Sequence, residues 1–183
     1  FVPSSKTKYL FIGRLLKEKG VNELLLAAND HLKNNIATFY FVGDHDKNNP
    51  SSIDFNSFTK MCNNNKSIKY LGYVDNIKSL LEKVDCLILP SYREGLSNVI
   101  LEALSMEIPV LASNVPGCNE LIKDGYNGFL FEPKKVSSIA IALNKFSNLD
   151  NKKIIDMGLK GRRFVKENYS IDKLLTIYEL DLL

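Results

Sequence analysis

Two glutamates, Glu94 and Glu102, stand with seven residues between them around the predicted start of a helix. Pro90 closes an apolar run just before them, and Gly95 follows the first glutamate. The first backbone N–H groups of a helix have no partner inside it and attract anions, while a carboxylate can accept two hydrogen bonds from a diol. The segment therefore predicts a site for a ligand with both phosphate groups and sugar hydroxyls. Each glutamate taken alone is more typical of an ordinary surface charge.

A second polar segment spans residues 13–20, between a predicted strand and a predicted helix. Gly13 allows a sharp turn or a close approach to a ligand. Arg14 can donate two parallel hydrogen bonds to phosphate oxygens, and Lys19 adds a point charge. The spacing is neither that of a Walker A loop nor that of the three-glycine dinucleotide motif. On its own, this segment is more typical of solvated surface cations.

The elements that must position these residues are short apolar runs that alternate with helical stripes. Strands are predicted over residues 9–12, 38–42, 70–74, 86–89, 110–112 and 129–131, and helical spacing over residues 21–32, 77–84 and 97–106. A repeated strand–helix–strand pattern with right-handed crossovers predicts an α/β fold, a Rossmann-like doubly wound parallel sheet. Ligands of such sheets bind beyond the carboxyl ends of the strands, where both polar segments lie.

Residues 134–183 are predicted to form a helical C-terminal segment. One apolar stripe covers residues 136–143 and another covers residues 171–182, with Ser170 as the N-cap of the last helix. The asparagine-rich stretch at residues 63–65 is predicted to be a loop. His31 is expected to be a surface or packing residue, and Cys86 a core residue.

Taken in order along the chain, these segments resemble a known family. Residues 93–103 resemble the EX7E motif of retaining glycosyltransferases with the GT-B fold, in particular the large group-1 family (family 4). Residues 13–20 resemble that family's phosphate-binding segment, and residues 108–113, 116–122, 124–130 and 168–170 resemble its later blocks. The resemblance covers nearly the whole chain. It implies that residues 1–183 are one nucleotide-sugar-binding domain, half of a GT-B fold, with an N-terminal acceptor domain outside this chain.

The resemblance also implies a role for each part of the site. The catalytic contacts are expected from Glu94, on the donor sugar, and from Arg14 and Lys19, on the diphosphate. Glu102 is expected to bind the ribose hydroxyls. The other donor-binding residues are expected to act mostly through their backbone: Gly13, Gly95, Leu96, Ser97, Asn98 and Val99 around the sugar and phosphates, and Val74 and Tyr92 near the base. Gly117 stands alone where many relatives carry a glycine pair, which leaves the contacts of that loop open.

Asp44 and Asp46 flank His45 in a pattern that superficially resembles the metal-binding DxD motif of other transferases. We expect a polar turn there instead, because Arg14, Lys19 and the helix start can offset the charge of the diphosphate without an ion. No metal and no cofactor are therefore expected, and the substrate is a nucleoside-diphosphate sugar, with a UDP-sugar favoured. His45 is not expected to be a catalyst.

The composition limits which classes of partner and which cellular location are expected. The chain has 183 residues, a formal net charge of +3 and charges of both signs mixed along it, which argues against a nucleic-acid partner. An odd number of cysteines, three, argues against a disulfide framework and favours a reducing compartment. A cytoplasmic location is expected, or a peripheral one at the inner face of the membrane for the full-length protein. The start at Phe1 suggests a fragment, which would bind nucleotide without transferring sugar.

The resemblance implies an enzyme that moves a sugar from a nucleoside-diphosphate sugar to an acceptor hydroxyl with retention of anomeric configuration. The bias toward Asn, Lys and Ile is typical of an AT-rich bacterial genome, where a saccharide or lipid-linked acceptor and a role in surface polysaccharide or glycoconjugate synthesis are expected. Two alternatives remain at this point. One is a nucleotide-sugar epimerase of GT-B-like architecture. The other is a non-catalytic flavodoxin-like binding module, with Asp44 and Asp46 as its acidic cluster.

Overall fold

The computed structural model describes residues 6–170 and residue 173. Its centre is a six-stranded sheet in the order β3-β2-β1-β4-β5-β6, in which every neighbouring pair is parallel. The order runs outward in both directions from the β1–β4 pair, as in a doubly wound sheet. The predicted Rossmann-like fold is therefore confirmed. The strands are β1 (Thr7–Ile12), β2 (Ala37–Val42), β3 (Ile68–Tyr70), β4 (Cys86–Leu89), β5 (Val110–Ser113) and β6 (Gly128–Phe131).

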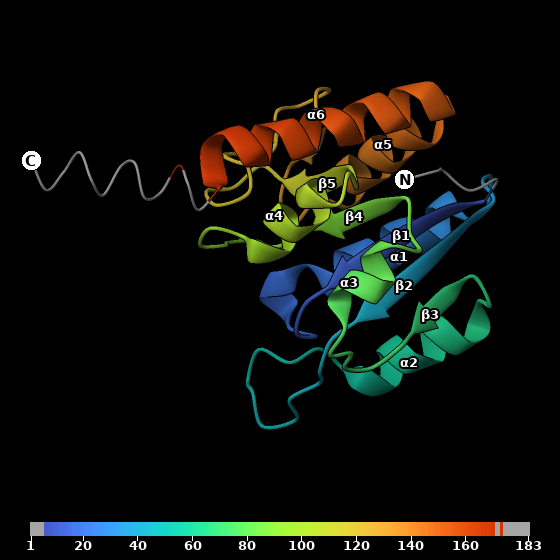
Figure 1. Ribbon diagram of the computed structural model, residues 1–183. Coiled ribbons are helices and arrows are strands. Elements are labelled where there is room, and N and C mark those ends of the chain that lie inside the picture. The colour runs from blue at the N-terminus through green and yellow to red at the C-terminus, as the bar shows by residue number, and fades with distance from the viewer. Residues whose placement is uncertain (1–5, 171–172, 174–183) are drawn as a thin grey trace, which may run out of the picture.

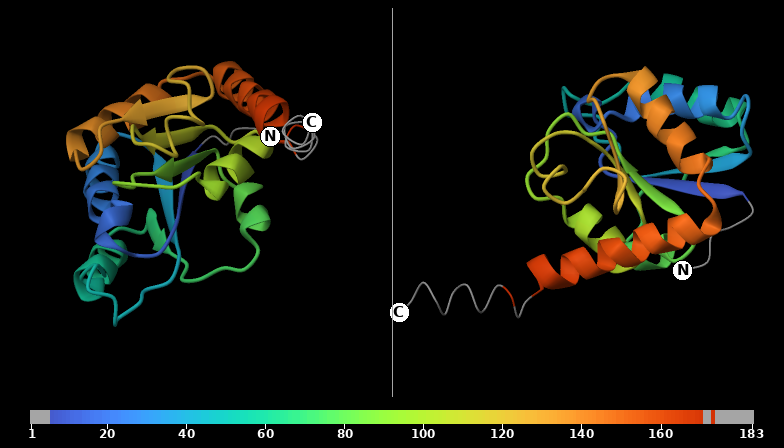
Figure 2. Two further views of the ribbon diagram at one scale, coloured as in Figure 1. Left: turned by 90° about the vertical axis from the view of Figure 1, so that its left-hand side faces the viewer. Right: turned by 90° about the horizontal axis from the view of Figure 1, so that it is seen from above.

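Helices cover both faces of this sheet (Figures 1 and 2). One buried cluster joins the sheet to α1 (Val21–His31), α2 (Phe55–Asn64) and α5 (Val136–Ser147). The other joins it to α3 (Ile77–Leu81) and α4 (Asn98–Ser105). The last described helix, α6 (Asn151–Tyr169), contributes Ile154 and Met157 to the first cluster and Val165 to the second. It therefore ties the two layers together.

Local chemistry explains where several of these elements begin. All four residues of β4 are buried, which suits a strand in the middle of a parallel sheet. Asp54 caps α2 by accepting hydrogen bonds from the Asn56 and Ser57 amides, and Asp150 caps α6 through the Lys153 amide. A short 3-10 turn, η1 (Lys17–Lys19), leads into α1 through Gly20, whose φ of 67° places it in the left-handed region.

Several sequence predictions differ from the structure at element boundaries. The third strand was predicted over residues 70–74, but β3 ends at Tyr70, because Gly72 has a φ of 70° and Tyr73 turns out to solvent. Helix α4 begins at Asn98, not at Ser97, and ends at Ser105. Residues 63–65 were predicted to be a loop, but the first two of them belong to α2. The asparagines are typical of a loop, but here they end a helix whose buried face is formed by Phe58 and Cys62.

The prediction that the chain is helical after Pro133 is confirmed by α5 and α6. The stripe predicted for residues 171–182 lies outside the described residues, Lys173 excepted. Ser170 Oγ accepts a hydrogen bond from the Lys173 amide at 3.3 Å, which is the bond an N-cap side chain makes.

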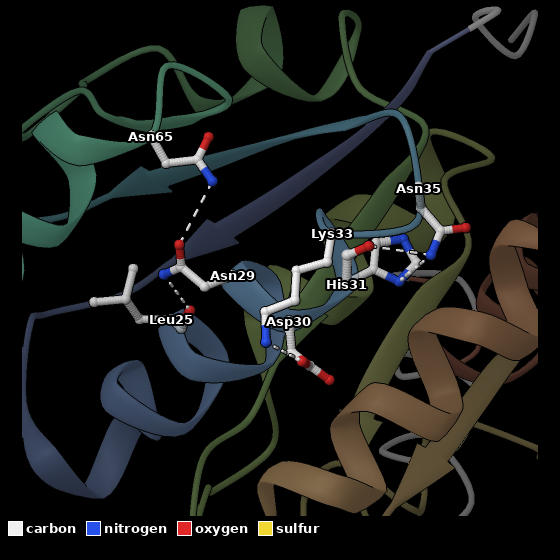
Figure 3. A network of polar contacts seen from close by, with 7 residues as sticks. All are labelled: Leu25, Asn29, Asp30, His31, Lys33, Asn35 and Asn65. Carbon is white, nitrogen blue, oxygen red and sulfur yellow. Dashed lines mark hydrogen bonds and ion pairs between the residues drawn. The ribbon is translucent and has the colours of Figure 1, made fainter.

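His31, at the end of α1, is a packing residue, as predicted. It is 4% exposed, and its ring lies edge-on to Tyr9 and Phe39. Its Nδ1 lies 3.1 Å from Asn144 Oδ1 of α5, and Asn35 Nδ2 donates to its backbone oxygen (Figure 3). The same figure shows a local contact, from Asn29 Nδ2 to the Leu25 carbonyl, and a longer-range one, from Asn65 Nδ2 to Asn29 Oδ1 at 3.5 Å.

All three cysteines are free and buried, and Cys86 is a core residue, as predicted. Within the described part of the chain, no helix combines the length and the apolar character needed to cross a membrane.

Candidate functional site

The two polar segments meet beyond the carboxyl ends of β1 and β4, which are neighbouring strands. Residues 13–20 follow β1, and residues 90–97 follow β4 and lead into α4. This edge of the sheet lies toward the left in Figure 1. The structure therefore brings together two segments that are far apart in the sequence: Lys19 and Glu94 are separated by 75 positions.

Lys19 and Glu94 form an ion pair in which Nζ lies 2.6 Å from Oε1. The two side chains are only 21% and 14% exposed. The local i,i+3 and i,i+4 pairs of the described chain have both partners at least 36% exposed. Because shielding from water strengthens a charge-assisted bond, this pair is the best-protected charge contact among the described ion pairs.

Backbone contacts fix the two loops that carry this pair. The Tyr92 amide donates to the Glu18 carbonyl at 2.7 Å, beside Lys19. Gly20 packs so closely on Pro90 that a Cβ there would lie 2.1 Å from the proline carbonyl oxygen. Any other residue at position 20 would push the loops apart, in addition to the strain of its positive φ. These backbone contacts therefore fix the relative positions of the two loops that carry Lys19 and Glu94.

Gly117 closes the same loop from the side of β5. A Cβ at this position would lie 1.7 Å from the Gly95 carbonyl oxygen, and φ is 79°. The Gly117 carbonyl in turn accepts a hydrogen bond from the Ser97 amide at 3.4 Å. The contacts of Gly117 that the sequence left open are therefore made with residues 94–97. One amide that was expected to face the ligand, that of Ser97, is used inside the protein.

The start of α4 remains available to an anion. Ser97 is the N-cap residue, is 7% exposed, and makes no side-chain cap hydrogen bond. Asn98 is exposed and Val99 half-buried, and the first amides of a helix have no partner within it. Gly95 and Leu96 are exposed beside them. This combination of free amides, helix dipole and nearby Lys19 suits a phosphate group.

Arg14 is exposed at the end of β1, next to Gly13. Gly43, which follows β2, packs against Gly13 so closely that a Cβ would lie 1.9 Å from the Gly13 carbonyl oxygen. Because neither glycine has a side chain, nothing at position 13 or 43 blocks the Arg14 guanidinium from a ligand over the strand ends.

Asp44 and Asp46 cap their own turn in the loop after β2. Asp44 Oδ1 accepts from the His45 amide at 2.9 Å, and Asp46 Oδ1 accepts from the Asn48 amide at 3.0 Å. The His45 ring stacks on Phe55 at 4.3 Å between centroids. These geometries are those of a polar turn.

Glu102 faces a groove of about 790 Å³ between the segment after β3 and helices α4 and α6. Asp75, Asn76 and Ile77 also line this groove, as does Tyr169 at the end of α6. Val74 precedes Asp75 and packs against the buried cluster under α4. The structure thus brings Glu102 together with the segment that follows Val74, and their roles toward ribose and base stay a prediction. Asn98 is not among the groove's lining residues.

Tyr92 lies elsewhere than the base prediction assumed. Its hydroxyl donates to Glu23 Oε1 of α1 at 2.7 Å, and the Lys134 ammonium lies 4.9 Å from its ring centroid. Burial, and then the Glu23 carboxylate, raise the pKa of the Tyr92 hydroxyl. Helix α1 covers one face of the sheet, whereas Val74 packs on the other. The prediction that both residues lie near one base is therefore not supported by the geometry: Tyr92 ties the β4 loop to α1.

Sequence reasoning missed several residues under this edge. Glu23 could not be distinguished from the other polar residues of its helix. Ser91 Oγ and Ser113 Oγ, at the ends of β4 and β5, are fully buried, and neither has a hydrogen-bond partner among the described residues. Cys118 is fully buried below the ion pair, and burial first, then the Glu94 carboxylate, raise the pKa of its thiol to about 12.

Comparison with known proteins defines the class to which this fold and site belong. Residues 2–164 match the family described as glycosyl transferases group 1. The chain is similar to the UDP-Gal:alpha-D-GlcNAc-diphosphoundecaprenol alpha-1,3-galactosyltransferase of Escherichia coli, at 32% identity over 178 residues, covering 93% of this chain and 44% of that protein. The chain spans about half the length of the curated relatives it matches.

Two solved structures show the same fold. The C-terminal domain of the group 1 glycosyl transferase LpcC from Francisella tularensis is 28% identical, with a TM-score of 0.78, and the match covers 93% of this chain and 89% of that one. Anabaena Alr3699/HepE in complex with UDP is 22% identical, with a TM-score of 0.84, covering 97% of this chain and 49% of that one. The chain belongs to the glycosyl transferases group 1 family and has the Rossmann-like fold of one GT-B half.

Proposed function

We propose that this chain is the donor-binding half of a retaining glycosyltransferase that takes its sugar from a nucleoside diphosphate, with UDP favoured. The observation that carries the proposal is the meeting of Arg14, Lys19, Glu94 and the start of α4 at one edge of the sheet. Cations and free amides suit a diphosphate, and a carboxylate beside them suits sugar hydroxyls. The donor that the name of the Escherichia coli relative prints, UDP-Gal, supports the same class of donor.

In this proposal, each group stabilises part of the donor. Arg14 and the α4 amides offset the charge that grows on the diphosphate as the sugar leaves. Glu102 holds the ribose in the groove beside residues 74–77, where the base lies. The acceptor, a saccharide or lipid-linked sugar, and the groups that activate it belong to an N-terminal domain outside this chain. A cytoplasmic location, peripheral at the inner face of the membrane, suits such an acceptor.

Calorimetric titration of the chain with UDP, GDP and ADP tests this proposal. We expect one nucleotide to bind, and Arg14→Ala and Glu102→Gln each to weaken it by roughly tenfold, because each loses a charge-assisted contact. Arg163→Ala is the matched control, since Arg163 is exposed on α6 and outside the site. Binding should survive EDTA, because no step assigned here uses a metal. Binding that ignores both site variants would mean that the phosphate site lies elsewhere.

Product analysis separates the proposed transfer from the alternatives. The isolated chain should bind nucleotide without transferring sugar, whereas the full-length protein should transfer it with retention. A free epimerised sugar nucleotide as the product would favour the epimerase. The flavodoxin-like binding module loses its support, because Asp44 and Asp46 cap their own turn and the chain belongs to a glycosyltransferase family.

A further inference from the structure

The Lys19–Glu94 pair joins two residues that the proposed function assigns to different parts of the donor. Lys19 is assigned to the diphosphate and Glu94 to the sugar, yet in the structure they bind each other. The nitrogen–oxygen distance of 2.6 Å is short, and the contact is largely shielded from water. A donor therefore meets a site in which the charge of Lys19 is already neutralised.

We propose that Glu94 acts as a latch on Lys19, and that the sugar hydroxyls of the donor release it, so that the pair discriminates a sugar nucleotide from a bare nucleoside diphosphate. The inference rests on the proposed function and deepens it, because it adds a specificity role to the donor site. It follows from the charges at the pair and from the rigidity of its two loops.

A bare diphosphate has to compete with Glu94 for Lys19. If the ammonium turns to a phosphate, the carboxylate loses its partner and faces the negative charge of the ligand. The buried, un-ionised Cys118 below offers no compensating charge. A shielded carboxylate without a partner is costly. The cost of breaking the ion pair therefore lowers the affinity for a bare nucleotide.

A sugar nucleotide changes this balance, because its hydroxyls can donate to Glu94 when Lys19 leaves. Both charges then have partners, Glu94 on the sugar and Lys19 on the phosphate. After transfer the sugar is gone, and Glu94 pairs with Lys19 again. The binding of the remaining nucleoside diphosphate is thereby weakened. The latch favours entry of the donor and release of the product.

The loops cannot relieve this competition by moving apart. The Tyr92–Glu18 backbone bond and the close contact of Gly20 with Pro90 hold them on one side. Gly117 packs on Gly95 on the other side. The choice of partner therefore has to be made by the side chains.

The test is the sign of the effect of Glu94→Gln on bare nucleotide. Removing the charge frees Lys19, so UDP should bind roughly three- to tenfold more tightly, as expected for the loss of one partly shielded ion pair. The preference for the sugar nucleotide over UDP should shrink at the same time. Calorimetry at fixed salt measures both, and GDP or ADP replaces UDP if the wild-type chain binds that nucleotide instead.

Glu107→Gln is the matched control. Glu107 also forms an ion pair between distant segments, 3.5 Å from Arg162, but precedes β5 at the opposite edge of the sheet. This variant should leave UDP affinity unchanged. Thermal unfolding of each variant checks that the fold is kept.

A double-mutant cycle with Lys19→Met distinguishes a latch from simple repulsion between Glu94 and phosphate. The latch predicts that the gain from Glu94→Gln disappears when Lys19 is absent. A gain that persists in the Lys19→Met background overturns the latch. So does a Glu94→Gln variant that binds UDP no more tightly than the wild type. A wild-type chain that binds none of the three nucleotides overturns the proposed function as well, so the two failures differ.

Discussion

The two edges of the sheet use buried polar groups in opposite ways. At the amino edge, Asn127 is fully buried before β6, where its Oδ1 accepts from the Lys123 amide at 2.8 Å and its Nδ2 donates to the Leu121 carbonyl at 2.9 Å. Asp85, before β4, likewise accepts from the Lys8 amide at 2.7 Å. These side chains hydrogen-bond to backbone groups of neighbouring segments and so hold those segments together.

At the carboxyl edge, the polar side chains serve the backbone less. Ser91 and Ser113 carry buried hydroxyls without partners among the described residues, and Lys19 and Glu94 neutralise each other across two loops. An ion pair can be exchanged for a ligand, whereas a side chain that closes a backbone bond cannot. The difference teaches that the amino edge contributes to folding and that the carboxyl edge keeps polar groups for a ligand.

The largest effect that sharpens this comparison is expected at the amino edge. Asn127→Ala should lower the free energy of unfolding by roughly 2–3 kcal/mol, because it leaves one donor and one acceptor of the backbone without partners. Denaturant unfolding measures this loss, and nucleotide affinity of the folded variant should be unchanged.

Asn114→Ala applies the same change at the carboxyl edge and serves as its control. Asn114 is exposed after β5, and its Oδ1 accepts a hydrogen bond from the Asn119 side-chain amide at 2.9 Å. It should cost less than about 0.5 kcal/mol. Equal losses in the two variants would remove the distinction between the edges.

A smaller effect of opposite sign is expected for the buried serines. Ser91→Ala and Ser113→Ala should each raise the free energy of unfolding by about 1 kcal/mol, since a buried hydroxyl without a partner is replaced by hydrogen. Ser138→Ala is the control, because its hydroxyl accepts from the Glu132 amide at 2.9 Å, and it should destabilise instead. If the Ser91 and Ser113 variants are also destabilised, those hydroxyls have partners in solution.

The sequence predicted the sheet better than it predicted the site. Apolar runs such as residues 86–89 identify buried strands, and strand–helix alternation then fixes which loops share an edge. The prediction of the third strand was too long because Leu71 and Tyr73 are apolar residues that are exposed in the structure. Only tertiary packing decides whether such residues are buried. Helix α6 was missed as a separate element because its long polar face outweighs the stripe of Ile154, Met157 and Val165.

The candidate site shows the same limit. Motif spacing placed Lys19 and Glu94 at one edge, but their pairing depends on backbone contacts at Gly20 and Gly117 between distant segments. The contact of Tyr92 with α1 was not predicted, because the sequence does not say on which face of the sheet a loop side chain lies. Its partner, Glu23, comes from a helix with no motif of its own.

The smallest effect is expected from His31, whose buried ring at the end of α1 is the amino-edge counterpart of the shielded charges at the site. Burial lowers its pKa, and bonds to Asn144 and the charge of Asp30 oppose that shift only in part. The unfolded chain therefore takes up a proton at a higher pH than the folded chain, where Nε2 is buried without a partner among the described residues. Stability should be full above about pH 6.5 and should fall as the pH is lowered from there toward the folded pKa.

Urea unfolding at pH 7.5, 6.5 and 5.5 measures this dependence, to which one proton contributes at most about 1.4 kcal/mol per pH unit. His31→Gln should be less stable at pH 7.5, because it disturbs the packing with Tyr9 and Phe39, yet its stability should fall less steeply with acid. His45→Gln changes the other histidine, which stacks on Phe55 near the carboxyl edge, and should keep the wild-type slope. A wild-type slope in His31→Gln, or a slope that is lost in His45→Gln, would assign the acid sensitivity to the carboxyl edge instead.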